Sequence, residues 1–245
     1  MPRVFLPVEE NPRTIHITGE KAHYLSSVLR CKKGEQLEIL DGRGHSYSAR
    51  ITSVVRKEIT AEVLGAVSHA TESPVNLILV QGLLKGEKLE LVIQKATELG
   101  VSEIIPAITE RSQVRNTGKI ARWRKIAEDA SRQSGRTAIP IIHEPSALKD
   151  IFSGDGPYTP SSGKCKGLLL WERKGVRMKE AMKGLEGCRS LVIAVGPEGG
   201  FTEEEVQAAG EQGFVVATLG SRILRAETAA IAATTIAQLF LGDMG

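Results

Sequence analysis

The C-terminal segment, residues 190–245, holds an arginine and two glutamates suited to a reaction in which negative charge develops. Arg225 precedes a long apolar stretch, and its guanidinium stays protonated and presents a rigid fork of donors. Glu227 and Glu198 carry carboxylates that can accept a proton or orient a water. We therefore take Arg225 as the candidate for stabilising negative charge and the glutamates as candidate proton acceptors. The alternatives are an ordinary ion pair for Arg225 and a helix-start role for Glu227.

Two predicted strands position these residues. Segments 190–195 and 214–219 are short, apolar and rich in β-branched residues, and each ends at a glycine turn, as buried parallel strands do. Open α/β sheets bind ligands in the crevice at the carboxyl ends of such strands. The sequence therefore predicts a small-molecule site formed by residues 196–200 and 219–225.

The negative charge around the helix start predicted at Glu203 restricts which ligands the site can bind. Thr202 and Glu205 have the spacing of a capping box, so a helix is predicted to begin at Glu203. Four glutamates between positions 198 and 205 suit the helix dipole but repel a phosphate, the usual ligand of a glycine-rich helix start. A neutral or cationic ligand fits better, and S-adenosylmethionine, with a sulfonium and an uncharged adenosine, is one. Turn chemistry without a ligand is the alternative for this loop taken alone.

Two sequence motifs carry a family resemblance. They are Gly196-Pro-Glu-Gly-Gly200 and Leu219-Gly-Ser-Arg-Ile-Leu-Arg-Ala-Glu-Thr228. Together they resemble the RsmE family, a group within the SPOUT superfamily of methyltransferases. Further similar segments, in chain order, are His23 with Val28-Leu-Arg30, Asp41-Gly42, Gly86–Glu90, Gln94–Val101, Glu110-Arg-Ser112 and Gln133–Arg136. The resemblance covers nearly the whole chain and is weakest from about Ser146 to Lys166.

The resemblance implies a function and a site. It implies S-adenosylmethionine-dependent methylation of N3 of a uridine in 16S ribosomal RNA, with the RNA held in the small ribosomal subunit. It also implies a homodimer with a C-terminal trefoil knot, a feature that no sequence pattern would predict. The implied cofactor-binding residues are Leu170, Trp171, Glu172, Gly196, Pro197, Glu198, Gly199, Gly200, Leu219, Gly220, Ser221, Ile223 and Leu224. Trp171 departs from the pattern because it is bulky.

Basic residues concentrate between Arg111 and Arg136, where eight basic residues face only two acidic ones. A helix is predicted over 119–134, with Ile120, Trp123, Ala127, Ala130 and Ser134 as its inward stripe. A solvated surface is the alternative, but the excess of one sign favours phosphate contacts. The candidate RNA-binding residues are Arg3, Arg30, Lys32, Arg43, Arg111, Gln133, Arg136 and Arg222. For Arg222, a surface or phosphate-contacting role is at least as well supported as catalysis.

The chain divides near residue 73. Residues 1–72 contain short runs in which apolar and polar residues alternate, and glycine turns separate these runs, which predicts a small β-barrel. The resemblance implies that this barrel is a PUA-like RNA-binding domain. Residues 73–245 alternate strands and helices, which predicts an α/β domain with a parallel sheet, and the resemblance makes this the SPOUT domain with its knot. We also expect one short helix over 23–30 and a mobile surface loop over 154–163.

Composition excludes several classes of protein. Hydrophobic residues make up 41% and charged residues 25% of the chain, as in ordinary globular proteins, and the net charge of +3 identifies no partner. Three cysteines without a CxxC motif and five scattered histidines predict no disulfide framework and no metal site. The motifs of P-loop and Rossmann nucleotide sites are absent. With no signal peptide and no membrane-length apolar tract, we expect a cytoplasmic protein without a membrane partner.

The sequence leaves two questions open. The segment 229–241 is apolar nearly all round, so it must be buried either in its own core or against a second subunit. The alternative functions are a non-catalytic RNA-binding or ribosome-assembly factor and a SPOUT methyltransferase that acts on transfer RNA or a ribose 2′-hydroxyl.

Overall fold

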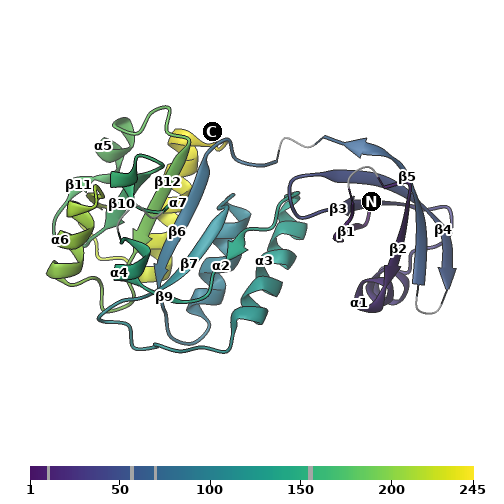
Figure 1. Cartoon of the computed structure of the whole chain (residues 1–245), viewed down its shortest axis with the longest axis horizontal. Coiled ribbons are helices and arrows are strands. Elements are labelled where there is room, and N and C mark those ends of the chain that lie inside the picture. The colour runs from purple at the N-terminus through teal and green to yellow at the C-terminus, as the bar shows by residue number, and fades with distance from the viewer. Residues whose placement is uncertain (10–11, 56–57, 69–70, 154–156) are drawn as a thin grey trace. The chain divides into compact units, whose positions relative to one another are not determined.

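The chain forms two compact units (Figure 1). The structure is a computed structural model that describes residues 1–9, 12–55, 58–68, 71–153 and 157–245. One unit comprises Met1–Glu72 with Ser131–Ile139, and the other comprises Ser73–Ala130 with Pro140–Gly245. Among the described residues, no helix is both long and apolar enough to cross a membrane.

The first unit contains a five-stranded sheet in the order β1-β3-β4-β5-β2. Its strands are β1 (Arg3–Phe5), β2 (Thr14–Thr18), β3 (Gln36–Leu40), β4 (Ser46–Val55) and β5 (Glu58–Val67). The β1–β3 pair is parallel and the other pairs are antiparallel. Side chains of β2 alternate between exposed and buried, and Ile15 and Ile17 join Leu37, Ile39 and Ile59 in one core. This alternation is what the sequence pattern predicted.

The helix predicted over 23–30 begins earlier, ends earlier and is not one regular helix. It consists of α1 (Gly19–His23) followed by one π-helical turn, η1 (Tyr24–Val28). The N–H of Leu29 donates to the carbonyl of Tyr24, five residues back, a bond that a 3.6-residue periodicity does not reveal. Arg30 then adopts a left-handed φ of 55° and ends the helical segment.

The second unit is an α/β domain with a parallel sheet, as predicted. The strand order is β11-β13-β10-β12-β6-β7-β8, and β9 also pairs with β7. All of these pairs are parallel. The strands are β6 (Asn76–Gly82), β7 (Glu103–Ile108), β8 (Ile141–Ile142), β9 (Ser146–Ala147), β10 (Lys166–Leu170), β11 (Val176–Arg177), β12 (Ser190–Val195) and β13 (Val215–Thr218).

Helices pack on both faces of this sheet, which explains why its central strands are almost wholly apolar. The helical elements are α2 (Lys88–Glu98), α3 (Ile120–Ser134), α4 (Leu148–Ile151), the 3₁₀ turn η2 (Pro160–Ser162), α5 (Met178–Lys183), α6 (Glu203–Glu211) and α7 (Ala226–Leu241). Residues of α4 and α6 share one core cluster with alternate residues of β6 and β12. Helix α7 packs on β6 and β12 and against α2.

The capping box predicted before α6 is present. The hydroxyl of Thr202 accepts a hydrogen bond from the N–H of Glu205 (3.2 Å), and the carboxylate of Glu205 accepts one from the N–H of Thr202 (2.9 Å). Helix α6 therefore begins at Glu203, where the sequence placed it.

Two other expectations need correction. On α3, Ser131 is fully buried whereas Ser134 is exposed. The inward stripe therefore ends at Ser131, and its predicted last member, Ser134, is wrong. Of the loop predicted over 154–163, residues 154–156 lie outside the described part of the chain. The remainder is not a simple surface loop, because Thr159 is fully buried and Ser161 donates its N–H to the carbonyl of Gln212 (2.9 Å).

Candidate active site

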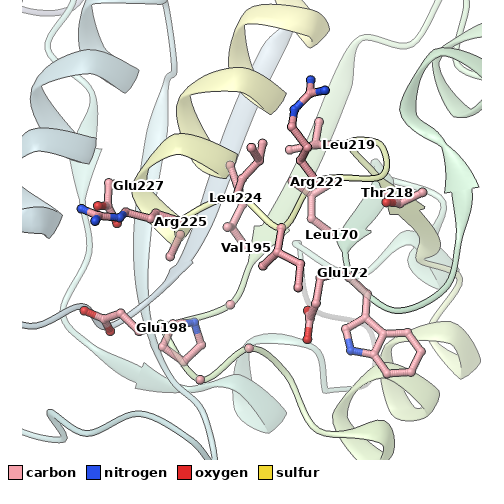
Figure 2. Close-up of a pocket in the computed structure, with 18 of the residues that line it drawn as sticks. Leu170, Glu172, Val195, Glu198, Thr218, Leu219, Arg222, Leu224, Arg225 and Glu227 are labelled. Atoms are coloured by element: carbon pink, nitrogen blue, oxygen red, sulfur yellow. The ribbon is translucent and has the colours of Figure 1, made fainter.

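A pocket of about 670 Å³ lies at the carboxyl ends of β10, β12 and β13 (Figure 2). These strands are neighbours in the sheet and run parallel, so the loops that follow them meet at one edge. The loops contribute residues 170–172, 195–200, 217–220 and 222–225, and the first turn of α7 closes the pocket. Its volume lies within the range typical of small-molecule sites.

Most of the residues implied as cofactor-binding come together here. Twelve of the thirteen line the pocket, and Ser221 does not. Arg222, assigned above to RNA, also lines it, and Figure 2 shows its guanidinium pointing away from Glu198 and Glu172. The sequence assignment missed six lining residues: Lys88, Val195, Ala217, Thr218, Ala226 and Ala229. Lys88 lay within a segment already matched to the family, and Val195 and Thr218 lay in predicted strands, so these signals were available.

Hydrogen bonds and backbone conformation hold the turn at 196–200 in place. Gly200 donates its N–H to the carbonyl of Pro197 (2.9 Å) and has a φ of 69°, which a residue with a Cβ rarely adopts. Beneath the turn, the fully buried carboxamide of Gln81 donates to the carbonyls of Val195 (3.4 Å) and Gly196 (3.2 Å). The end of β6 therefore holds the start of the turn.

The three catalytic candidates all line the pocket but differ in their partners. Arg225 is exposed at the N-cap of α7, and among the described residues it forms no ion pair with Glu198 or Glu227. One carboxylate oxygen of Glu227 is buried without a hydrogen-bond partner in the described part of the chain. Figure 2 shows Arg225, Glu227 and Glu198 on one side of the pocket, with Glu172 and Thr218 on the other.

The carboxylate of Glu198 already has hydrogen-bond donors within the protein. Its carboxylate accepts hydrogen bonds from Nζ of Lys88 (3.0 Å) and from the N–H of Lys85 (3.2 Å). Burial raises the pKa of Glu198, but Lys88 and nearby backbone N–H groups lower it by more, so the pKa lies below its usual value. A carboxylate held in its charged form is a weaker proton acceptor, which makes Glu227 the better candidate.

The residues assigned to RNA fall into three groups. Arg30, Lys32, Arg43 and Gln133 are exposed on the first unit. Arg111 and Arg222 belong to the second unit, where Arg111 donates to the carbonyl of Gly199 (3.1 Å). Arg3 and Arg136 instead pair with carboxylates of the first unit.

For Arg136 the structure contradicts an RNA contact. This residue is only 4% exposed, and its guanidinium donates to the carboxylate of Glu72 at 2.8 Å and 3.0 Å. Burial raises the pKa of Glu72, but the hydrogen bonds and charge of Arg136 and the N–H groups of Thr137 and Ala138 lower it overall. Arg3 forms a similar pair with the buried Glu38 (2.8 Å). Sequence alone does not distinguish such internal pairs from surface arginines.

Within the part of the chain that the structure describes, the other reactive groups do not form a second centre. Among the described residues, no cluster of three or more histidines, cysteines or carboxylates is placed to hold a metal ion. Cys31 and Cys165 are buried free thiols, and burial raises the pKa of both. A thiol with a raised pKa is a weak nucleophile.

Comparison with known proteins gives concordant results for both units. Residues 71–238 match the family model of an RNA methyltransferase domain, and residues 17–64 match that of an RNA methyltransferase PUA domain. The chain is 34% identical to ribosomal RNA small subunit methyltransferase E of Bacillus subtilis, with 91% of this chain and 88% of the relative covered. The enzyme of the same name from Synechocystis is 33% identical, with 92% and 73% covered.

A solved structure is similar over the full length. It is the ribosomal RNA small subunit methyltransferase E of Neisseria gonorrhoeae bound to S-adenosyl methionine. The two chains share 33% identity and superpose with a TM-score of 0.88, with all of both chains covered.

Proposed function

The chain belongs to the ribosomal RNA small subunit methyltransferase E family, and from this premise we propose that it methylates N3 of a uridine in 16S ribosomal RNA, with S-adenosylmethionine as methyl donor. The observation that carries the proposal is the pocket at the ends of β10, β12 and β13, which is lined by the glycine turn 196–200 and by Arg225. A non-catalytic RNA-binding protein has no need of such a pocket.

The pocket residues fit S-adenosylmethionine. Of the three carboxylates that line the pocket, that of Glu198 is paired with Lys88, whereas those of Glu172 and Glu227 suit a cationic sulfonium. A buried carboxylate oxygen of Glu227 and the buried indole N–H of Trp171 have no partner within the described residues, so an acceptor and a donor remain for a ligand. When bound, the cofactor would supply an electrophilic methyl carbon on sulfur. The three loops would hold it, with the turn 196–200 fixed in advance.

The remaining groups suit the chemistry of a uridine. N3 belongs to an imide, so it must lose its proton before it can attack a methyl carbon. The negative charge then spreads onto O2 and O4, and a guanidinium stabilises charge of this kind as it develops. We assign this role to Arg225, which has no carboxylate partner among the described residues. We assign the role of accepting the N3 proton to Glu227, because Lys88 favours the charged form of Glu198.

The rest of the assembly belongs to the same proposal. Residues 1–72 would form the PUA-like RNA-binding domain, with the exposed Arg30, Lys32 and Arg43 as phosphate contacts. Residues 73–245 would form the catalytic domain, whose C-terminal loops are knotted. Leu239 and Phe240 of α7 are 57% and 41% exposed, which favours burial of this helix end against a second subunit. The homodimer would act in the cytoplasm on ribosomal RNA held in the small subunit.

Calorimetry and methyl transfer test the proposal together. The full-length protein should bind S-adenosylmethionine and transfer label from its methyl group to RNA of small ribosomal subunits. Arg225→Ala should bind the cofactor but transfer far less label. Absence of cofactor binding would favour an assembly factor without catalysis, and labelling of transfer RNA instead would favour the other SPOUT activity.

A further inference from the structure

Arg111 contacts the cofactor turn from outside the pocket. This arginine lies three residues after the end of β7 and does not line the pocket. One of its terminal nitrogens, Nη1, donates to the carbonyl of Gly199 (3.1 Å) and to that of Phe201 (3.3 Å). Its guanidinium thus bridges the last part of the turn and the residue that follows it.

The approach between Arg111 and the turn is close. A Cβ placed on Gly199 would lie 3.0 Å from Cβ of Arg111, which is tighter than most such contacts. Gly199 itself has no left-handed φ, unlike Gly200. A side chain at position 199 would therefore be disfavoured by contact with Arg111 and not by backbone conformation.

Neighbours of Arg111 contact the same region. The N–H of Glu110 donates to the carboxylate of Glu205 (2.8 Å), the glutamate of the capping box. The segment itself is stiffened by Ser112, whose hydroxyl accepts from the N–H of Thr109 (3.0 Å). Segment 109–112 therefore supports both the glycine turn and the start of α6.

We propose that Arg111 is a positioning residue for the cofactor turn and not a ligand of RNA phosphate. This inference rests on the proposed function of the pocket. Arginine suits the role because its planar group stays charged and keeps its donors in fixed directions. With the carbonyls of Gly199 and Phe201 held, the turn is ordered before the cofactor binds, and less ordering entropy opposes binding.

Three variants of the full-length protein test this inference. Arg111→Ala removes the bridge, and Arg111→Lys keeps the charge but loses the planar fork. Lys125→Ala is the matched control, because it removes one exposed positive charge from the same basic segment. Each variant is compared with wild type for its melting temperature, its Kd for S-adenosylmethionine by calorimetry, and its Kd for small-subunit ribosomal RNA by filter binding.

Arg111→Ala should weaken cofactor binding about tenfold, as expected for the loss of one or two charge-assisted hydrogen bonds. Arg111→Lys should restore part of that affinity. RNA affinity should fall no further in Arg111→Ala than in Lys125→Ala. If Arg111→Ala is too unstable to assay, Arg111→Lys decides, since the inference requires weaker cofactor binding with unchanged charge.

The results separate two kinds of failure. Wild-type protein that binds no S-adenosylmethionine would refute the proposed function and this inference with it. Normal cofactor affinity in both Arg111 variants, with a loss of RNA affinity larger than that of Lys125→Ala, would overturn only the inference and restore Arg111 as an RNA ligand.

Discussion

Gly82→Ala should disrupt the cofactor turn from beneath, although Gly82 itself does not line the pocket. Gly82 ends β6 and is buried, and its φ is one that alanine also adopts. A Cβ at this position would lie 2.5 Å from Cδ of Pro197 and 2.9 Å from the carbonyl carbon of Gly196. Since packed carbon atoms lie about 3.5–4.0 Å apart, the turn must move by about 1 Å.

The expected effect follows from that displacement. Overpacking of a well-packed site costs about 1–3 kcal/mol. If this cost falls on the cofactor-binding form of the turn, the affinity for S-adenosylmethionine should drop by roughly 5- to 150-fold. Calorimetry on the folded variant measures this affinity, and a thermal melt shows how much of the cost falls on the fold itself.

A glycine without close neighbours provides the control. Gly210, near the end of α6, has nothing within 4 Å of a Cβ placed on it. Gly210→Ala should therefore bind the cofactor normally and gain about 0.5–1 kcal/mol of stability, because alanine suits a helix better. If Gly82→Ala matches wild type in both cofactor affinity and melting temperature, the packing described for the turn is wrong.

Three further predictions concern the charged groups. Arg225→Ala should lower the rate of single-turnover methylation by roughly a hundredfold at saturating cofactor. A normal methylation rate in the bound state would show that Arg225 takes no part in the chemical step. The Glu72–Arg136 pair lowers the pKa of Glu72 below the usual 4.5, so its stabilisation is present above that pH and lost as the pH falls through the lowered pKa. The free energy of unfolding in urea across this pH range should therefore depend less on pH in Glu72→Gln than in wild type. An equal pH dependence would exclude the Glu72–Arg136 pair as a source of it. If two subunits share each site, mixing inactive Arg225→Ala with an inactive Arg30→Ala, Arg43→Ala variant should restore up to about a quarter of wild-type activity, whereas inactive verified mixed dimers would contradict sharing.

Local signals in the sequence predicted much of the fold. The capping box of Thr202 and Glu205 lies within four residues, and α6 begins where these residues place it. The runs of β-branched residues became β12, which has the predicted bounds, and β13, which is one residue shorter at each end than predicted. Such features depend on neighbours along the chain, so a single sequence contains them.

Contacts between distant segments were not predictable in this way. Gln81 and Arg111 both hold the turn 196–200, yet nothing near them in the sequence indicates it. Arg136 and Arg43 look alike in the sequence, although one is buried against Glu72 and the other is exposed. Only the path of the chain decides which arginines face inward. The strand pattern predicted the pocket at residues 196–200 and 219–225, whereas its third loop, residues 170–172, came only from the family resemblance.

Identifying the methylated atom tests most directly whether the protein methylates N3 of a uridine. Small ribosomal subunits that lack the modification would be incubated with the protein and S-adenosylmethionine, and the 16S ribosomal RNA would be digested to nucleosides. Chromatography and mass spectrometry against authentic standards should then show 3-methyluridine, which Arg225→Ala should not produce at a comparable rate. A methyl group on a ribose or on another base, or no methylated nucleoside at all, would contradict methylation at uridine N3.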